Sequence, residues 1–145
     1  MHFVTGGAFN GKSAWVRAYN QLTQENCQWF SAYHCDPIPV DFDQVTTDYL
    51  VLEGIERWIR EGLQGSSGDE VQETWRGLLR QLENWESMDG KGSVILIGTD
   101  ITKGIVPLER EDRLWRDVCG RVFQAAVSSC GRVDVIWYGL NKRLK

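Results

Sequence analysis

The chain has 145 residues, of which 42% are hydrophobic and 25% are charged, and its formal net charge is −4. This balance is typical of a globular protein rather than a disordered one, and the length favours a single domain over residues 1–145. The negative charge argues against nucleic acid as an electrostatic partner, and no apolar run approaches the ~20 residues that cross a bilayer.

The N-terminal residues lead directly into the first expected strand, and no stretch before it resembles a leader peptide. We therefore expect a cytoplasmic protein that partners neither membrane nor nucleic acid. The four cysteines have no CxxC spacing, so we expect reduced thiols that pack as small core residues.

The first patterned stretch is a strand at 3–5, a glycine-rich loop and a helix at 12–22. The loop fits G-x-x-x-x-G-K-[ST], the pattern of a phosphate-binding P-loop. Its glycines allow backbone N–H groups to approach phosphate closely, and the N-terminus of the helix adds positive potential. The predicted nucleotide-binding residues are Gly6, Gly7, Ala8, Phe9, Asn10, Gly11, Lys12 and Ser13.

Two side chains of this loop have expected roles in catalysis. Lys12 would place its ammonium group beside the β- and γ-phosphates, and the Ser13 hydroxyl would bind Mg²⁺. The alternative is an ordinary glycine-rich turn with an exposed lysine, but the strand before it and the helix after it favour the nucleotide site.

The remaining elements follow from apolar periodicity and turn residues. In chain order we expect a strand at 27–33, a turn at 35–39, irregular chain to 47, a strand at 48–54, helices at 55–63 and 71–85, a turn at 89–92, a strand at 93–100, a helix at 108–129, a strand at 133–139 and a basic tail at 140–145.

Strands that alternate with helices predict an α/β fold with a mostly parallel sheet and helices on both faces. With the loop, this indicates a three-layer P-loop NTPase-like (RecA-like) architecture. Ligands of such sheets bind beyond the carboxyl ends of the strands, where the loop and two acids, Glu53 and Asp100, are expected.

Glu53 and Asp100 are the candidate acids for holding Mg²⁺ or orienting the nucleophile. Each follows an apolar strand, so each is expected to face the phosphates, and the sequence leaves open which one performs which task. The alternative for either acid is a solvated carboxylate or a helix N-cap. The arginines of the 108–124 stretch are interpreted as members of ion pairs along a solvated helix. The alternative is that one or two of them bind phosphate or meet a neighbouring subunit.

Several of these residues together resemble the adenosylcobinamide kinase/adenosylcobinamide-phosphate guanylyltransferase family of cobalamin biosynthesis. The family begins with Val-Thr-Gly-Gly-Ala-x-x-Gly-Lys-Ser, as residues 4–13 do here, and a strand that ends Leu-Leu-Glu is matched by Val51-Leu52-Glu53. Its downstream signature is matched by Gly104-Ile105-Val106-Pro107, Arg110, Arg113, Arg116-Asp117, Gly120-Arg121-Val122, Gln124 and Tyr138-Gly139-Leu140.

The resemblance implies a kinase that uses ATP or GTP, with Mg²⁺ as cofactor, to phosphorylate the aminopropanol hydroxyl of an adenosylcobinamide-like acceptor. It also implies a homo-oligomer and a second reaction, in which GMP is transferred through a guanylylated histidine. Asp100 stands where the family has a glutamate.

The segment that carries this histidine in the family is shorter here and holds only His34. His34 lies too close to the second strand to be the expected equivalent, so the guanylyl acceptor stays unknown and guanylyl transfer is expected at most as a residual activity. The alternative function is a nucleotide-binding regulatory or diverged protein of the same fold, without cobinamide turnover.

Overall fold

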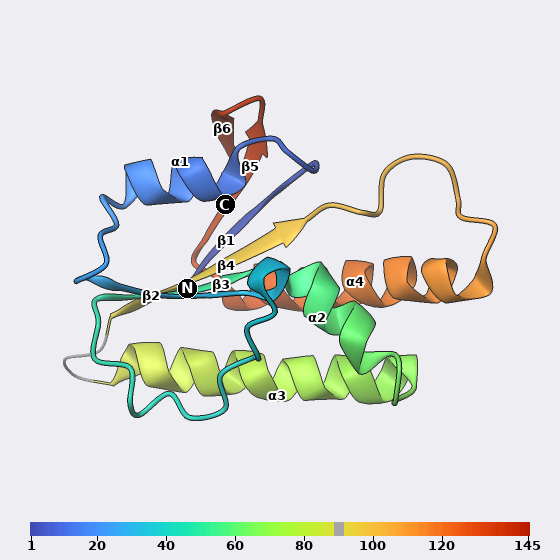
Figure 1. Ribbon diagram of the computed structural model, residues 1–145, viewed down its shortest axis with the longest axis horizontal. Coiled ribbons are helices and arrows are strands. Elements are labelled where there is room, and N and C mark those ends of the chain that lie inside the picture. The colour runs from blue at the N-terminus through green and yellow to red at the C-terminus, as the bar shows by residue number, and fades with distance from the viewer. Residues whose placement is uncertain (89–91) are drawn as a thin grey trace.

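The computed structural model describes residues 1–88 and 92–145, and six strands form one sheet (Figure 1). Part of the turn expected at 89–92 lies outside the described residues. The sheet order is β2-β3-β4-β1-β5-β6, with every neighbouring pair parallel except β5 and β6. The strands are β1 (His2–Gly6), β2 (Cys27–Ser31), β3 (Tyr49–Glu53), β4 (Ser93–Thr99), β5 (Arg132–Trp137) and β6 (Leu140–Arg143).

Helices cover both faces of this sheet, which confirms the predicted three-layer α/β architecture. α1 lies on one face, and α2, α3 and α4 lie on the opposite face (Figure 1). The helices are α1 (Lys12–Tyr19), the short 3₁₀ helix η1 (Ala32–His34), α2 (Ile55–Gly62), α3 (Gly68–Ser87) and α4 (Arg110–Ser129).

The central strand β4 shows why the sheet is covered on both sides. Its side chains alternate between the two faces: Ile95 and Ile97 pack in the cluster that contains Val16 of α1, and Val94 and Leu96 pack with α2, α3 and α4. All four are at most 1% exposed. A strand that is buried on both faces needs a continuous apolar run, and each such side chain contributes about 1.5–3 kcal/mol on burial.

α1 and β2 both end earlier than their apolar patterns predict. α1 ends at Tyr19 rather than at 22, because Gln21 adopts a left-handed φ of 52° that a helix cannot contain. β2 ends at Ser31 rather than at 33, because the chain turns into η1 and Cys35 takes a left-handed φ of 63°.

α3 begins three residues earlier than predicted. α3 starts at Gly68 instead of 71, because the Ser67 hydroxyl accepts from the Glu70 N–H and the Glu70 carboxylate accepts from the Ser67 N–H, at 3.3 and 2.7 Å. This capping box satisfies two donors at the start of the helix.

The prediction of a basic tail at the C-terminus is wrong. The residues expected as a basic tail form β6, which pairs antiparallel with β5 through a two-residue turn at Tyr138 and Gly139. Every β6 residue is exposed, so no apolar alternation marks this strand in the sequence, and its charged residues suit an edge position.

The described helices include none that combines the length and the apolar character needed to cross a membrane.

Candidate nucleotide site

The predicted phosphate loop leaves the carboxyl end of β1 and runs directly into α1. Gly6 has a φ of +144°, and a Cβ atom there would lie 2.2 Å from the carbonyl oxygen of Ile136, so only glycine fits. Gly11, the residue before α1, has a left-handed φ of +83°. The two glycines thus permit the tight turn that carries the chain from strand to helix.

Lys12 folds back across this loop. Its Nζ donates to the Gly7 carbonyl oxygen at 2.9 Å, and the residue is only 8% exposed. Burial lowers the pKa of Lys12, while the carboxylates of Glu56 and Glu53 oppose that change. The ammonium group therefore lies inside the site, close to two acids, where phosphate oxygens could replace the Gly7 carbonyl as its acceptor.

The Ser13 hydroxyl donates to Oε1 of Glu53, and Trp29 Nε1 donates to the other carboxylate oxygen at 2.9 Å. β3, which carries Glu53, is not a neighbour of β1, because β4 lies between them. The two predicted Mg²⁺ ligands are therefore brought together by the strand order.

The oxygens of Ser13 and Glu53 fit the requirements of Mg²⁺. This ion prefers hard oxygen ligands and is commonly held by one or two carboxylates together with substrate phosphates and water. Within residues 1–88 and 92–145 no group of three or more His, Cys, Asp or Glu side chains gathers as a metal cage. A site completed by nucleotide phosphates needs no such cage.

A cavity of about 670 Å³ opens beside the loop, a size common for small-molecule sites. It lies between the loop and the carboxyl ends of β3 and β4, with α2 and α4 on its far side. Its lining residues are Ala8, Phe9, Asn10, Gly11, Lys12, Ser13, Ala14, Tyr33, Glu53, Glu56, Arg57, Arg60, Ile97, Thr99, Ile101 and Trp115.

Glu56 is a buried acid in this cavity that the sequence interpretation did not include. It is 3% exposed; its carboxylate accepts from the Thr99 N–H at 2.8 Å and from the Tyr33 hydroxyl. Tyr33 and Thr99 are themselves joined through their hydroxyls at 3.0 Å. Burial and the Glu56 carboxylate both raise the pKa of Tyr33. The sequence did carry one signal that could have identified Glu56 as a site residue, because Glu56 lies in the first helical turn after β3.

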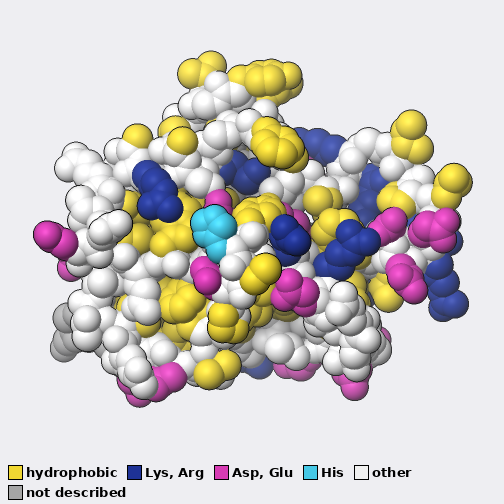
Figure 2. All heavy atoms as spheres, viewed as in Figure 1, with side chains coloured by type: hydrophobic (Ala, Val, Ile, Leu, Met, Phe, Trp, Pro, Cys, Tyr) yellow, Lys and Arg dark blue, Asp and Glu magenta, His cyan; other side chains and the backbone are white. Residues whose placement is uncertain are grey.

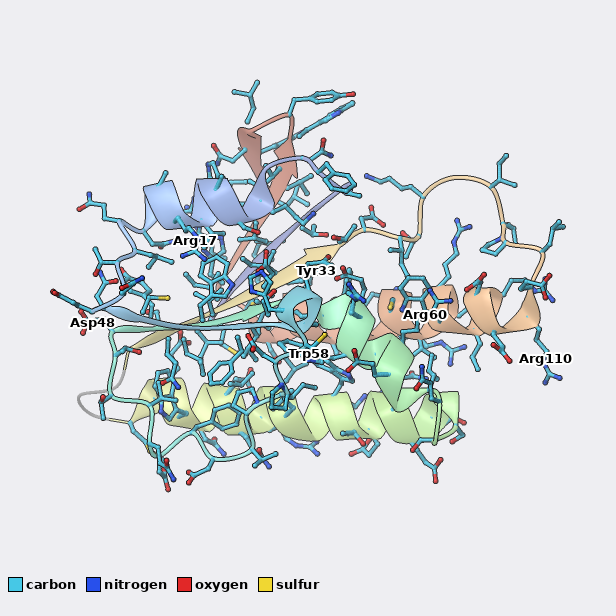
Figure 3. All side chains as sticks on the ribbon, viewed as in Figure 1. Arg17, Tyr33, Asp48, Trp58, Arg60 and Arg110 are labelled. Carbon is cyan, nitrogen blue, oxygen red and sulfur yellow. The ribbon has the colours of Figure 1, made fainter. Side chains whose placement is uncertain are left out.

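Two arginines of α2 form the far wall of the cavity. The Arg57 guanidinium lies 5.4 Å from the centre of the Tyr33 ring, and the Arg60 guanidinium lies 4.5 Å from that of Trp115. Arg60 also pairs with Asp112 at 3.0 Å. Figure 3 labels Tyr33 near η1 and Arg60 near α4, with α2 between the two labels. This wall is cationic and aromatic, and spacing alone did not reveal it.

Asp100 lies beside the loop, but its carboxylate is engaged elsewhere. Its N–H donates to the Gly6 carbonyl at 3.0 Å, whereas its carboxylate accepts from Thr102 and pairs with Lys103 at 3.2 Å. Burial alone would raise the pKa of Asp100, but these bonds lower it. Asp100 is not among the residues that line the cavity.

The segment between β4 and α4 is bound to α4 by arginines. Arg113 donates to the Pro107 carbonyl at 3.0 Å, and Arg116 donates to the carbonyls of Ile105, at 3.2 Å, and Thr102. These two arginines thus hold the backbone that follows Asp100, a task that the ion-pair interpretation did not anticipate. His34, which was not expected to be the guanylyl acceptor, is exposed and lies outside the cavity lining.

Comparison with known proteins identifies the family of the chain. A family model described as cobinamide kinase / cobinamide phosphate guanyltransferase matches residues 34–144. The match begins beyond the loop at 6–13, so the loop and the downstream segments are independent lines of evidence. No curated protein matches the chain.

Proposed function

The chain belongs to the cobinamide kinase/cobinamide phosphate guanyltransferase family, and from this premise we propose that it transfers the γ-phosphate of ATP or GTP to a hydroxyl of an adenosylcobinamide-like acceptor. The family resemblance predicted from the sequence is thereby confirmed, and with it an enzyme family of cobalamin biosynthesis. Our proposal covers two points beyond the family assignment: that the chain transfers phosphate from the nucleotide to the acceptor, and which acceptor it uses.

The observation that carries the proposal is the contact of the Ser13 hydroxyl with the Glu53 carboxylate beneath the phosphate loop. We assign Mg²⁺ to these two oxygens; when bound, it would neutralise charge on the β- and γ-phosphates. Lys12 and the loop N–H groups would hold the same phosphates from the other side. Phosphoryl transfer is catalysed mostly by such positioning and charge stabilisation.

The acceptor is assigned to the part of the cavity lined by Tyr33, Arg57 and Arg60. Its hydroxyl oxygen would bond to the γ-phosphorus as the bond to the β–γ bridging oxygen breaks, which releases ADP or GDP. The hydroxyl proton would pass to a carboxylate. Since Glu53 is assigned to Mg²⁺, Asp100 stays the candidate for this base, and it would have to exchange Thr102 and Lys103 for the substrate.

The first test is isothermal titration with ATP and with GTP in the presence of Mg²⁺, followed by addition of adenosylcobinamide and an assay for its phosphate ester. We expect nucleotide binding and product, and we expect Lys12→Ala to reduce product formation by about 100-fold or more. Lys142→Ala, which changes an exposed lysine on β6, is the matched control. Product that survives Lys12→Ala would contradict the role assigned to the loop.

A nucleotide-binding protein without cobinamide turnover is the second candidate. It is favoured by Asp100, whose carboxylate is held outside the cavity by its own segment. This candidate predicts nucleotide binding in the titration and no product from adenosylcobinamide.

Guanylyl transfer is tested separately by incubation with labelled GTP. Because His34 lies outside the cavity lining, we expect no covalent GMP on this residue. A label that disappears in His34→Ala would establish the second family reaction and overturn this expectation.

A further inference from the structure

The turn between β5 and β6 displays two aromatic side chains to solvent. Trp137 is 67% and Tyr138 is 82% exposed, and their rings stack with centroids 5.9 Å apart and an interplanar angle of 26°. Figure 2 shows hydrophobic side chains projecting at the top of the molecule, where Figure 1 places β5 and β6. A pair of flat exposed rings has no role in the cores described above.

The backbone of this turn makes Tyr138 an unexpected residue. Tyr138 and Gly139 have φ values of 51° and 79°, as a two-residue turn of the mirror-image class requires, and such turns favour asparagine followed by glycine. A bulky side chain at positive φ is strained and points to a functional constraint. The strained backbone at this position therefore indicates that the Tyr138 ring has a function.

The turn is joined to the phosphate loop. The Gly139 N–H donates to the Asn10 carbonyl at 2.9 Å, and a Cβ atom on Gly11 would lie 3.6 Å from the Gly139 Cα. The aromatic pair is thus attached, through one hydrogen bond and one close backbone contact, to the loop that would hold the phosphates.

The sheet order sets the direction in which a bound nucleotide would extend. Glu53, the proposed Mg²⁺ ligand, lies at the end of β3, on the β4 side of β1, whereas β5 and β6 lie on the opposite side of β1. Mg²⁺ bridges the β- and γ-phosphates, so the γ end faces β3. The nucleoside at the other end of the triphosphate then points toward the β5–β6 turn.

We propose that Trp137 and Tyr138 form the stacking surface for the purine base of the nucleotide, a proposal that rests on the nucleotide site of the proposed function. Aromatic rings stack on the π-face of any base. Such stacking does not involve hydrogen bonds to the base edge, so it does not distinguish adenine from guanine. The surface accordingly accepts both ATP and GTP and favours them over the smaller pyrimidine nucleotides.

The experiment compares ATP, GTP and inorganic tripolyphosphate, which has the phosphates but no base. Each is titrated with Mg²⁺ into the wild type, Trp137→Ala and Tyr138→Asn; the asparagine removes the ring and suits the turn. We expect each variant to weaken ATP and GTP about tenfold and to leave tripolyphosphate unchanged. Leu140→Ala, which shortens an exposed aliphatic side chain of the same hairpin, is the control and should bind all three as the wild type does.

The other outcomes are distinct. Unchanged ATP and GTP binding in both ring variants overturns the stacking surface and leaves the phosphate site intact. An equal loss of tripolyphosphate binding also overturns it, because the variants would then act on the phosphate loop, to which the turn is joined, and not on the base. If the wild type binds none of the three ligands, the proposed function fails and this inference fails with it. If all three variants shift the oligomeric state in sedimentation while ATP binding is unchanged, the rings belong to a self-association surface and the proposal is wrong.

Discussion

At the scale of single residues, the candidate site combines one buried amine with two acids. Lys12 is held at the Gly7 carbonyl, Glu53 at Ser13 and Trp29, and Glu56 at Thr99 and Tyr33. Each of these polar groups has a partner, as buried polar groups require. The arrangement keeps the ammonium group and the carboxylates in place before a ligand arrives, which is the preorganisation that phosphate transfer uses.

Glu53→Gln tests the assignment of Mg²⁺ at this scale. The amide keeps the size of the side chain but removes the negative charge that a hard cation needs. We expect the gain in ATP affinity on adding Mg²⁺ to fall by about tenfold, which is about 1.4 kcal/mol. Titrations with Mg²⁺ and with EDTA measure this gain, and Glu61→Gln, an exposed glutamate of α2, is the control. A full Mg²⁺ effect in Glu53→Gln would remove this carboxylate from the metal site.

A second residue-scale prediction concerns His2, which is 9% exposed and hydrogen-bonded to the buried Asp134 at 2.9 Å. Burial lowers the pKa of His2 below its ordinary 6.5, although the bond to Asp134 opposes the change. Between these two pKa values the unfolded chain binds more protons than the folded one, so the free energy of unfolding falls as the pH falls through this window.

Urea unfolding at about pH 7 and about pH 5 measures this effect. We expect His2→Gln, which keeps a donor for Asp134, to lose less stability over that interval than the wild type. The exposed His34 provides the matched control, and His34→Gln should lose as much as the wild type. Equal losses of stability in the wild type and His2→Gln would show that a group other than His2 causes the loss of stability at acidic pH.

At the scale of elements, the ends of the helices depend on a few local bonds. The capping box of Ser67 and Glu70 begins α3, and hydrogen bonds of Glu70 to the Ser67 backbone and side chain lower the pKa of this carboxylate. α3 in turn carries Trp75, Leu79, Leu82 and Trp85 into the core. A cap at the surface thus supports a helix whose inner side is buried.

Ser67→Ala removes the acceptor of the Glu70 N–H. We expect a loss of about 0.5–2 kcal/mol in the free energy of unfolding, measured by chemical denaturation, with little effect on nucleotide binding because α3 supplies no residue to the cavity. Ser66→Ala alters the adjacent exposed serine and should be close to neutral. A comparable loss in both variants would argue against the cap.

At the scale of the whole molecule, the site joins segments far apart in the sequence. The loop follows β1, Glu53 ends β3, Thr99 ends β4 and Trp115 belongs to α4, and all of them line one cavity. A ligand in that cavity contacts elements from both halves of the chain. Binding is therefore expected to stabilise the whole fold, because a ligand that binds only the folded state shifts the unfolding equilibrium.

Thermal unfolding with increasing ATP and Mg²⁺ measures this coupling. We expect the melting temperature to rise, with a gain of about 2.7 kcal/mol at 100 times the dissociation constant. Lys12→Ala should lose most of this rise, and Lys142→Ala should retain it. The same rise in both variants would place nucleotide binding away from the loop.

The sequence by itself was enough to predict the loop, the alternation of strands and helices, and the family. These features are local: glycine spacing defines the loop, and continuous apolar runs define strands such as β4 that are buried on both faces. The position of Glu53 directly after an apolar run was likewise readable, because a parallel strand presents its carboxyl end at the ligand-binding edge.

Only the tertiary structure decided which of these elements meet. Apolar periodicity shows which side of an element is buried, but it does not show which strands are neighbours. The strand order brings Ser13 to Glu53. Glu56 and Arg57 enter the site through the packing of α2, and β6 exists because its backbone pairs with β5. These contacts arise from packing and from pairing between distant segments, which no local pattern records.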